Sequence, residues 1–145
     1  MRNKNAPRGK VFDFKHKSEW SDEIAQQVHL SSQYRSHMVV VLGKALQRPP
    51  GWVRIVTITS TLPTTFDPNH YLPIYPTRKL QKGGVQLKLC GSFEGQTILR
   101  LLSYERIDKV EEVPLEILSE TIRSDGLSVM LQENSFGTLQ NRSGI

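Results

Sequence analysis

Three polar residues suited to metal binding or acid–base chemistry lie close together in the middle of the chain: Asp67, Asn69 and His70. One carboxylate and one imidazole supply two strong ligands, whereas zinc and iron sites use three or four, so a metal would need a distant partner such as His29 or His37. The alternative is a turn at Asp67–Pro68–Asn69 in which the aspartate satisfies backbone groups. The spacing favours the turn, and we predict no metal and no other cofactor.

Catalysis by a nucleophile or an acid–base pair needs a recognisable constellation, and GxSxG, HExxH, GxxxxGK[ST] and GxGxxG are all absent from the sequence. The carboxylates that could pair are Glu111, Glu112, Glu116 and Glu120, on a stretch with the pattern of a solvated helix face. The single cysteine, Cys90, lies on a strand pattern and is expected to be a buried thiol of the core. We therefore expect a protein that is not an enzyme.

Basic residues provide the strongest binding signal. The net charge is +5, and residues 1–17 alone hold six bases against Asp13, which accounts for the whole excess. Residues 44–88 hold seven bases and one acid, whereas residues 105–125 hold seven acids and three bases. Such polarity suits phosphate, in nucleic acid or anionic lipid, although a solvated charged surface is the alternative. The predicted phosphate-binding residues are Arg2, Lys4, Arg8, Lys10, Lys15, Lys17, Arg78, Lys79 and Lys82.

The elements that must position these residues are those of one domain, since 145 residues with 37% hydrophobic content suit a single core. We expect a basic flexible arm (1–17), an α+β domain (18–131) and a polar, mobile tail (132–145). No apolar run is long enough to span a bilayer, and the basic, polar start does not resemble a secretory signal, so synthesis in the cytosol is the simplest expectation.

Apolar spacing predicts helices over 18–37 and 113–124, the first followed either by further helix or by a short strand at 38–42. Strands are expected at 52–61 and 127–131, and a hairpin is expected from 85–90 and 96–104. The fold class is therefore α+β, with an antiparallel sheet of four to five strands and two helices packed on one face. Residues 65–84, rich in proline, are expected to cross between strands and present Arg78, Lys79 and Lys82.

Two short resemblances bear on function. Phe66–Asp67–Pro68–Asn69 is similar to part of the Asp-x-Asp-Asn signature of phage Holliday-junction resolvases of the RusA type, which use magnesium. The second aspartate of that signature is missing here, and no acid pair follows before Glu105. This resemblance implies a nucleic-acid-binding or nucleic-acid-processing protein of a phage or mobile element, which we keep as the alternative.

A longer resemblance covers residues 49–105. The order of PGW at 50–52, a strand, NHYLPI at 69–74, a basic stretch and VQLKLCGSFEGQTILRLL resembles the small single-domain matrix proteins of bornaviruses, which lack the N-terminal extension of this sequence. The resemblance implies a β-rich viral matrix protein that forms a homo-oligomer and binds the anionic membrane surface and RNA or nucleocapsid. The implied location is cytoplasmic, peripheral to the membrane or in the virion, and this is the function we expect.

Overall fold

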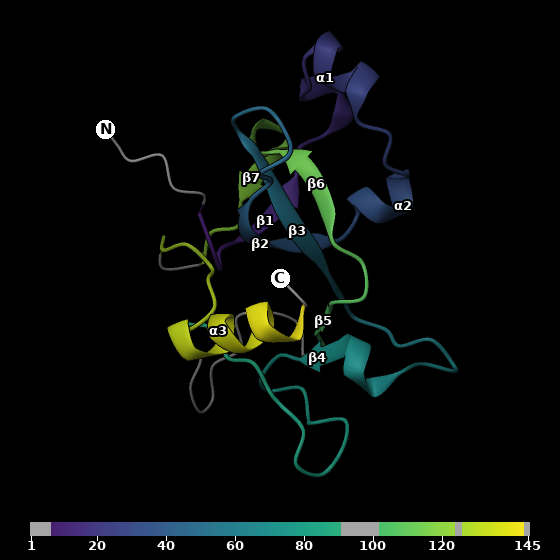
Figure 1. Ribbon diagram of the computed structural model, residues 1–145, viewed down its shortest axis with the longest axis vertical. Coiled ribbons are helices and arrows are strands. Elements are labelled where there is room, and N and C mark those ends of the chain that lie inside the picture. The colour runs from purple at the N-terminus through teal and green to yellow at the C-terminus, as the bar shows by residue number, and fades with distance from the viewer. Residues whose placement is uncertain (1–6, 91–101, 124–125, 144–145) are drawn as a thin grey trace.

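The computed structural model describes residues 7–90, 102–123 and 126–143, and these combine an antiparallel sheet of seven strands with three α-helices (Figure 1). The α+β class is therefore confirmed, with a larger sheet than the four to five strands expected. No helix among these residues is long and apolar enough to cross a membrane. The strands are β1 (Val11–Phe14), β2 (Met38–Lys44), β3 (Trp52–Thr59), β4 (Tyr71–Pro73), β5 (Tyr104–Arg106), β6 (Glu111–Pro114) and β7 (Leu118–Glu120). The α-helices are α1 (Asp22–Gln27), α2 (Ser32–Arg35) and α3 (Glu133–Arg142), and the 3₁₀ helices are η1 (Lys17–Glu19), η2 (Pro68–His70) and η3 (Leu115–Ile117).

The hairpin of β2 and β3 forms the centre of the sheet, because both strands are rich in the β-branched residues that favour extended backbone. The strand order is β4-β5-β3-β2-β1-β7, and β6 pairs with the first half of β3 while β5 pairs with its end. Leu42 is an extra residue in β2, since Val41 pairs with Ile55 and Gly43 with Arg54. This bulge bends the end of the hairpin.

Both faces of the central hairpin are buried, because alternate side chains enter two separate cores. The α1-side core contains Phe12, Trp20, Ile24, Val28, Val39, Val41, Ala45, Trp52, Val53, Ile55, Val113, Ile117 and Leu118. The α3-side core contains Val11, Val40, Leu42, Val56, Ile58, Leu72, Ile74, Leu87, Leu89, Ile107, Val129, Leu131 and Leu139. Helices therefore pack on both faces of the sheet, and the expectation of two helices on one face is wrong.

The N-terminal segment joins the sheet well before residue 17. Strand β1 pairs with β2 on one side and β7 on the other, and Val11 and Phe12 enter opposite cores. The backbone N–H of Gly9 also donates to the carbonyl of Val41 at 2.8 Å. The N-terminal segment is therefore not a flexible arm up to residue 17. Burial of the apolar side chains of Val11 and Phe12 stabilises the folded state more than their exposure to water would.

The helix expected over 18–37 is divided into η1, α1 and α2. Two serines cap separate helices: Ser21 Oγ accepts from the N–H of Ile24 at 3.2 Å, and Ser31 Oγ accepts from that of Tyr34 at 3.0 Å. Between them Val28 has extended backbone and is buried. Each cap satisfies backbone groups at a helix start, which favours two short helices over one long helix. The alternative of a strand at 38–42 is confirmed by β2.

The helix expected over 113–124 is absent, and β6, η3 and β7 occupy these residues instead. Val113 pairs with Val53 of β3, and Leu118 pairs with Phe14 of β1. The apolar residues whose spacing suggested a helix therefore lie on strands that pair with β3 and β1. The open edges of these two strands supply the backbone hydrogen bonds that an isolated helix would have to make alone.

The C-terminal residues also differ from expectation. Residues 133–142, expected to be part of a mobile tail, form α3, whose Leu139 is fully buried in the α3-side core. Ser135 joins α3 to the segment that contains Lys88, because its Oγ accepts a hydrogen bond from the backbone N–H of Lys88 at 2.9 Å. The expected strand at 127–131 is represented by bridges from Ser128, Met130 and Leu131.

The expected hairpin of 85–90 and 96–104 is only partly described, since 91–101 lie outside the described residues. Leu87 bridges to Ile74 and Leu89 bridges to Leu131, while β5, which begins at Tyr104, pairs with β3 and β4. Within the described residues, both 85–90 and β5 therefore pair with other parts of the chain. The alternation of apolar residues along the sequence could not identify these partners.

Deletion of residues 2–14 is expected to abolish the cooperative folded state, because it removes β1 from between β2 and β7 and uncovers both cores. Circular dichroism during thermal and urea unfolding measures this, with the variant Lys17→Ala, at an exposed position just beyond the strand, as the control. A deletion variant that melts like the full chain would contradict the placement of β1.

Candidate functional site

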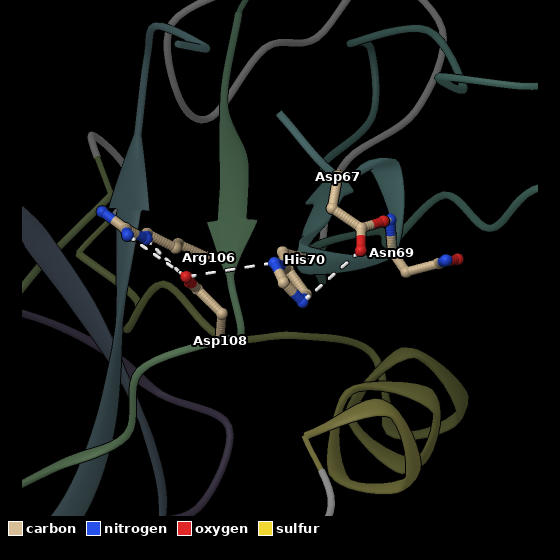
Figure 2. Close-up of polar contacts among 5 residues, drawn as sticks. All are labelled: Asp67, Asn69, His70, Arg106 and Asp108. Atoms are coloured by element: carbon tan, nitrogen blue, oxygen red, sulfur yellow. Dashed lines mark hydrogen bonds and ion pairs between the residues drawn. The ribbon is translucent and has the colours of Figure 1, made fainter. Parts of the chain in front are cut away.

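The Asp67–Asn69–His70 group lies at η2, directly before β4 (Figure 2). The Asp67 carboxylate accepts a hydrogen bond from the backbone N–H of Asn69 at 2.9 Å and so caps η2. The Asn69 side chain points away from His70 in Figure 2. The expected turn, in which Asp67 satisfies the backbone, is therefore confirmed.

His70 lies between two carboxylates. Its Nε2 is 3.7 Å from Asp67 Oδ2, and its Nδ1 is 4.0 Å from Asp108 Oδ2. Arg106 of β5 donates to both oxygens of Asp108, from Nε at 2.7 Å and from Nη2 at 3.2 Å. Figure 2 shows the resulting row of Arg106, Asp108, His70 and Asp67, and the backbone N–H of Ile107 adds a hydrogen bond to the carbonyl of His70 at 2.9 Å.

This acid–imidazole row connects η2 to the segment that follows β5. The hydrogen bond from Arg106 holds the pKa of the Asp108 carboxyl below its usual value, so this carboxylate is committed to the guanidinium. Within the described residues no group of three or more histidine, cysteine, aspartate or glutamate side chains is placed to hold a metal ion. The geometry is that of a polar link between η2 and the segment that follows β5.

The other candidate catalytic groups are dispersed. His29 lies between α1 and α2, and His37 lies directly before β2. Glu112 is paired with Arg48 at 3.0 Å, and Glu120 with Lys10 at 3.2 Å. These acids lie on strands β6 and β7, so the expected row of carboxylates along a helix face does not form.

Glu105 was not predicted to have a special environment, yet it is fully buried and neither carboxylate oxygen has a hydrogen-bond partner in the described residues. It lies opposite Ile58 of β3 and Leu72 of β4, both members of the α3-side core, whereas Arg106 beside it faces Asp108. Burial raises the pKa of the Glu105 carboxyl well above its ordinary value, since the charged form has lost its water. The side chain is therefore held as a neutral acid.

Replacement of Glu105 by Met is expected to increase the free energy of unfolding at neutral pH by about 1–3 kcal/mol, because it removes a buried polar group without a partner. In the wild type the folded state keeps the Glu105 proton after the unfolded state has lost it, so stability falls as pH rises above the ordinary pKa of glutamate. Urea unfolding across a pH series should show this slope in the wild type and a weaker slope in Glu105→Met. Equal slopes in the two proteins would contradict the buried neutral acid.

The basic residues predicted to bind phosphate lie on several parts of the surface. Arg78, Lys79 and Lys82 are exposed on the loop after β4, and Lys17 is exposed in η1. Lys10 is half-buried and paired with Glu120. Arg2 and Lys4 lie outside the described residues. Arg8, Lys15, Lys17, Arg78, Lys79 and Lys82 form no ion pair with any residue that the structure describes.

One group of bases lines an open pocket of about 370 Å³ on the α3 side of the sheet. Its lining joins Arg8, which precedes β1, to Lys44 of β2, Arg54 of β3 and Gln140 of α3. Leu42, Gly43 and Leu46 complete it, and the lining includes no acid. Sequence analysis named Arg8 and counted Lys44 and Arg54 in the basic segment, but it could not place the three together.

The fold explains why these bases meet. Gly43 pairs with Arg54 beside the bulge, and the N–H of Gly9 reaches the carbonyl of Val41, which brings the preceding Arg8 to the same end of β2. A second open pocket of about 330 Å³, at the other end of this hairpin, contains Asp13, Ser36 and His37 but no concentration of one charge. The basic pocket is therefore the more distinctive of the two.

Comparison with protein-family models and with curated proteins finds no match to this chain.

Proposed function

We propose that this is a structural protein of the viral matrix type, without enzymatic activity, that self-assembles and binds phosphate-bearing surfaces through its basic face. The observation that carries the proposal is the grouping of bases on the surface. Arg8, Lys44 and Arg54 line one pocket that includes no acid, and Arg78, Lys79 and Lys82 are exposed together on the loop after β4. Unpaired cations on a folded surface attract polyanions, and the attraction weakens as salt screens it.

Three further features support this function. Two of the segments that resemble bornavirus matrix proteins, 50–52 and 69–74, include the start of β3 and the strand β4, both in the sheet. The unpaired bases lie on surface segments around it, as binding without base-sequence preference requires. Exposed apolar side chains, Leu102, Ile122 and Leu127, at 57%, 53% and 59% exposure, provide area that contact between copies would bury. The proposed partners are anionic membrane, RNA or nucleocapsid, and further copies of the chain.

Binding to phosphatidylcholine vesicles that contain phosphatidylserine is expected to exceed binding to phosphatidylcholine alone, and to weaken as salt is raised. Flotation of the full chain with each vesicle type at two salt concentrations measures this, with light scattering to determine the oligomer. Parallel titrations with single-stranded and double-stranded nucleic acid test the other polyanion. A monomer that binds neither vesicles nor nucleic acid would contradict the proposed function.

A nucleic-acid-processing enzyme of the resolvase type is the second candidate, favoured by the two carboxylates that the fold brings to either side of His70 (Figure 2). In this arrangement the imidazole lies between Asp67 and Asp108, and Arg106 neutralises Asp108. Magnesium chemistry needs carboxylate oxygens directed at a shared metal, so the basic-surface function is the better supported.

Asp67→Asn is expected to leave vesicle and nucleic-acid binding unchanged and to cost less than about 1 kcal/mol of stability, since asparagine caps nearly as well as aspartate. Asn69→Ala is the matched control, because its side chain points away from the acid–imidazole row. Both variants are assayed for binding and for cleavage of branched DNA with Mg²⁺. Cleavage by the wild type that Asp67→Asn alone abolishes would favour the enzyme.

A further inference from the structure

The basic pocket is built from parts that are far apart in the sequence. Arg8 comes from the segment before β1, Lys44 and Arg54 from the β2–β3 hairpin, and Gln140 from α3. Like charges repel, so a folded protein that gathers three cations without an acid in the same lining leaves a site that an anion would stabilise.

Arg54 has unused hydrogen-bonding capacity in this pocket. Its Nε is buried and has no hydrogen-bond partner within the described residues. Glu112 lies opposite Arg54 in the pairing of β3 with β6, but its carboxylate is paired with Arg48 at 3.0 Å, and no ion pair with Arg54 is found. The guanidinium therefore keeps donors that could bind an oxyanion.

The residues around Arg54 hold the pocket open. A Cβ on Gly43 would lie 3.8 Å from Arg54 Nη2, so the glycine leaves the guanidinium uncovered on that side. The Arg8 guanidinium lies over the ring of Phe136, 5.3 Å from its centroid, which holds this base beside α3. Lys44 is exposed at the end of β2 and adds a third cation, and Gln140 adds an uncharged amide.

These groups match the chemistry of a phosphate group. A guanidinium presents parallel N–H donors to two oxygens of a tetrahedral anion, and a lysine ammonium adds charge without fixed geometry. Arg54 can supply the oriented contact, and Arg8 and Lys44 can neutralise the remaining charge.

Leu46 favours a lipid headgroup as the source of that phosphate. It lies in the turn between β2 and β3, lines the pocket and is 82% exposed, more than the other exposed large apolar side chains of the described residues. Lys44 and Arg48 flank it in the sequence. An exposed leucine between two bases suits the boundary between headgroups and acyl chains. Single-stranded RNA is usually held by stacking of its bases on exposed aromatic rings. Here the ring of Phe136 is covered by Arg8, and the buried ring of Trp52 is covered by Arg48, whose Cζ is 4.7 Å from the ring centroid.

We infer that Arg8, Lys44 and Arg54 form a binding site for the phosphate of an anionic lipid headgroup, and that Leu46 enters the acyl boundary beside it. This rests on the proposed function and names the residues of its membrane contact.

The test compares two variants that lose the same charges: Lys44→Gln/Arg54→Met at the pocket, and the control Lys109→Gln/Arg142→Met at exposed positions outside the predicted phosphate-binding residues. Flotation with vesicles of phosphatidylcholine and phosphatidylserine should show at least about tenfold weaker binding for the pocket variant, and less than about threefold for the control variant, given roughly fivefold per base at an anionic surface. Leu46→Ser should weaken vesicle binding without changing the melting temperature, since the side chain is exposed.

Inorganic phosphate, followed by the amide chemical shifts of Gly43 and Lys44, tests the anion site without a bilayer. The wild type and Leu46→Ser should respond, and the pocket variant should not. Thermal melts of all variants establish that each is folded, and Lys44→Gln alone provides the measurement if the Arg54 change unfolds the chain.

Equal losses for the two double variants, with no response to phosphate, would overturn the pocket while leaving general membrane binding intact. Loss of nucleic-acid binding but not of vesicle binding in the pocket variant would assign the site to nucleic acid and overturn the lipid. A wild type that binds neither vesicles nor nucleic acid would overturn the proposed function and the headgroup site together.

Discussion

The antiparallel pairing of β2 with β3, with both faces buried, is the constraint on which the rest of the structure depends. A strand hidden on both sides needs apolar residues at nearly every position, and Val39–Leu42 and Val53–Ile58 largely meet that need. Burial also obliges every backbone group of these strands to find a partner, and β1, β5 and β6 supply those partners at the open edges. Helices α1 and α3 then cover the two cores that the hairpin separates.

Arg54 of β3 and Glu105 of the neighbouring β5 place charged residue types in or beside this apolar hairpin, and the structure accommodates them differently. Arg54 lies at the end of the hairpin, where the bulge and Gly43 leave room for an open pocket, so its charge is kept near solvent. Glu105 lies opposite Ile58 in the interior, where no described residue forms a hydrogen bond with its carboxyl group, so burial raises its pKa and favours the neutral acid. A base in a pocket offers a binding site, whereas a buried acid only lowers stability.

The contrast between the acid–imidazole row and the basic pocket underlies the functional conclusion. In the row, Arg106 is hydrogen-bonded to Asp108, His70 lies between Asp108 and Asp67, and the result is a link between η2 and the end of β5. In the pocket, cations lie together with no acid in the lining. Because unsatisfied charge, rather than the presence of reactive residue types, makes a site attractive to a ligand, the basic surface has the stronger case.

The sequence by itself determined the α+β class, the strand at 52–61, the Asp67 turn and the surplus of basic charge, because these follow from local preference and composition; it left 38–42 open between helix and strand. It could not determine that β1 lies inside the sheet, that 113–120 pairs with β3 and β1, or that 133–142 forms a packed helix. Those outcomes depend on which distant edges and apolar faces are left open. For the same reason, only the tertiary structure could bring Arg8, Lys44, Arg54 and Gln140 together, since backbone contacts across the sheet, and not their spacing in the chain, set their separation.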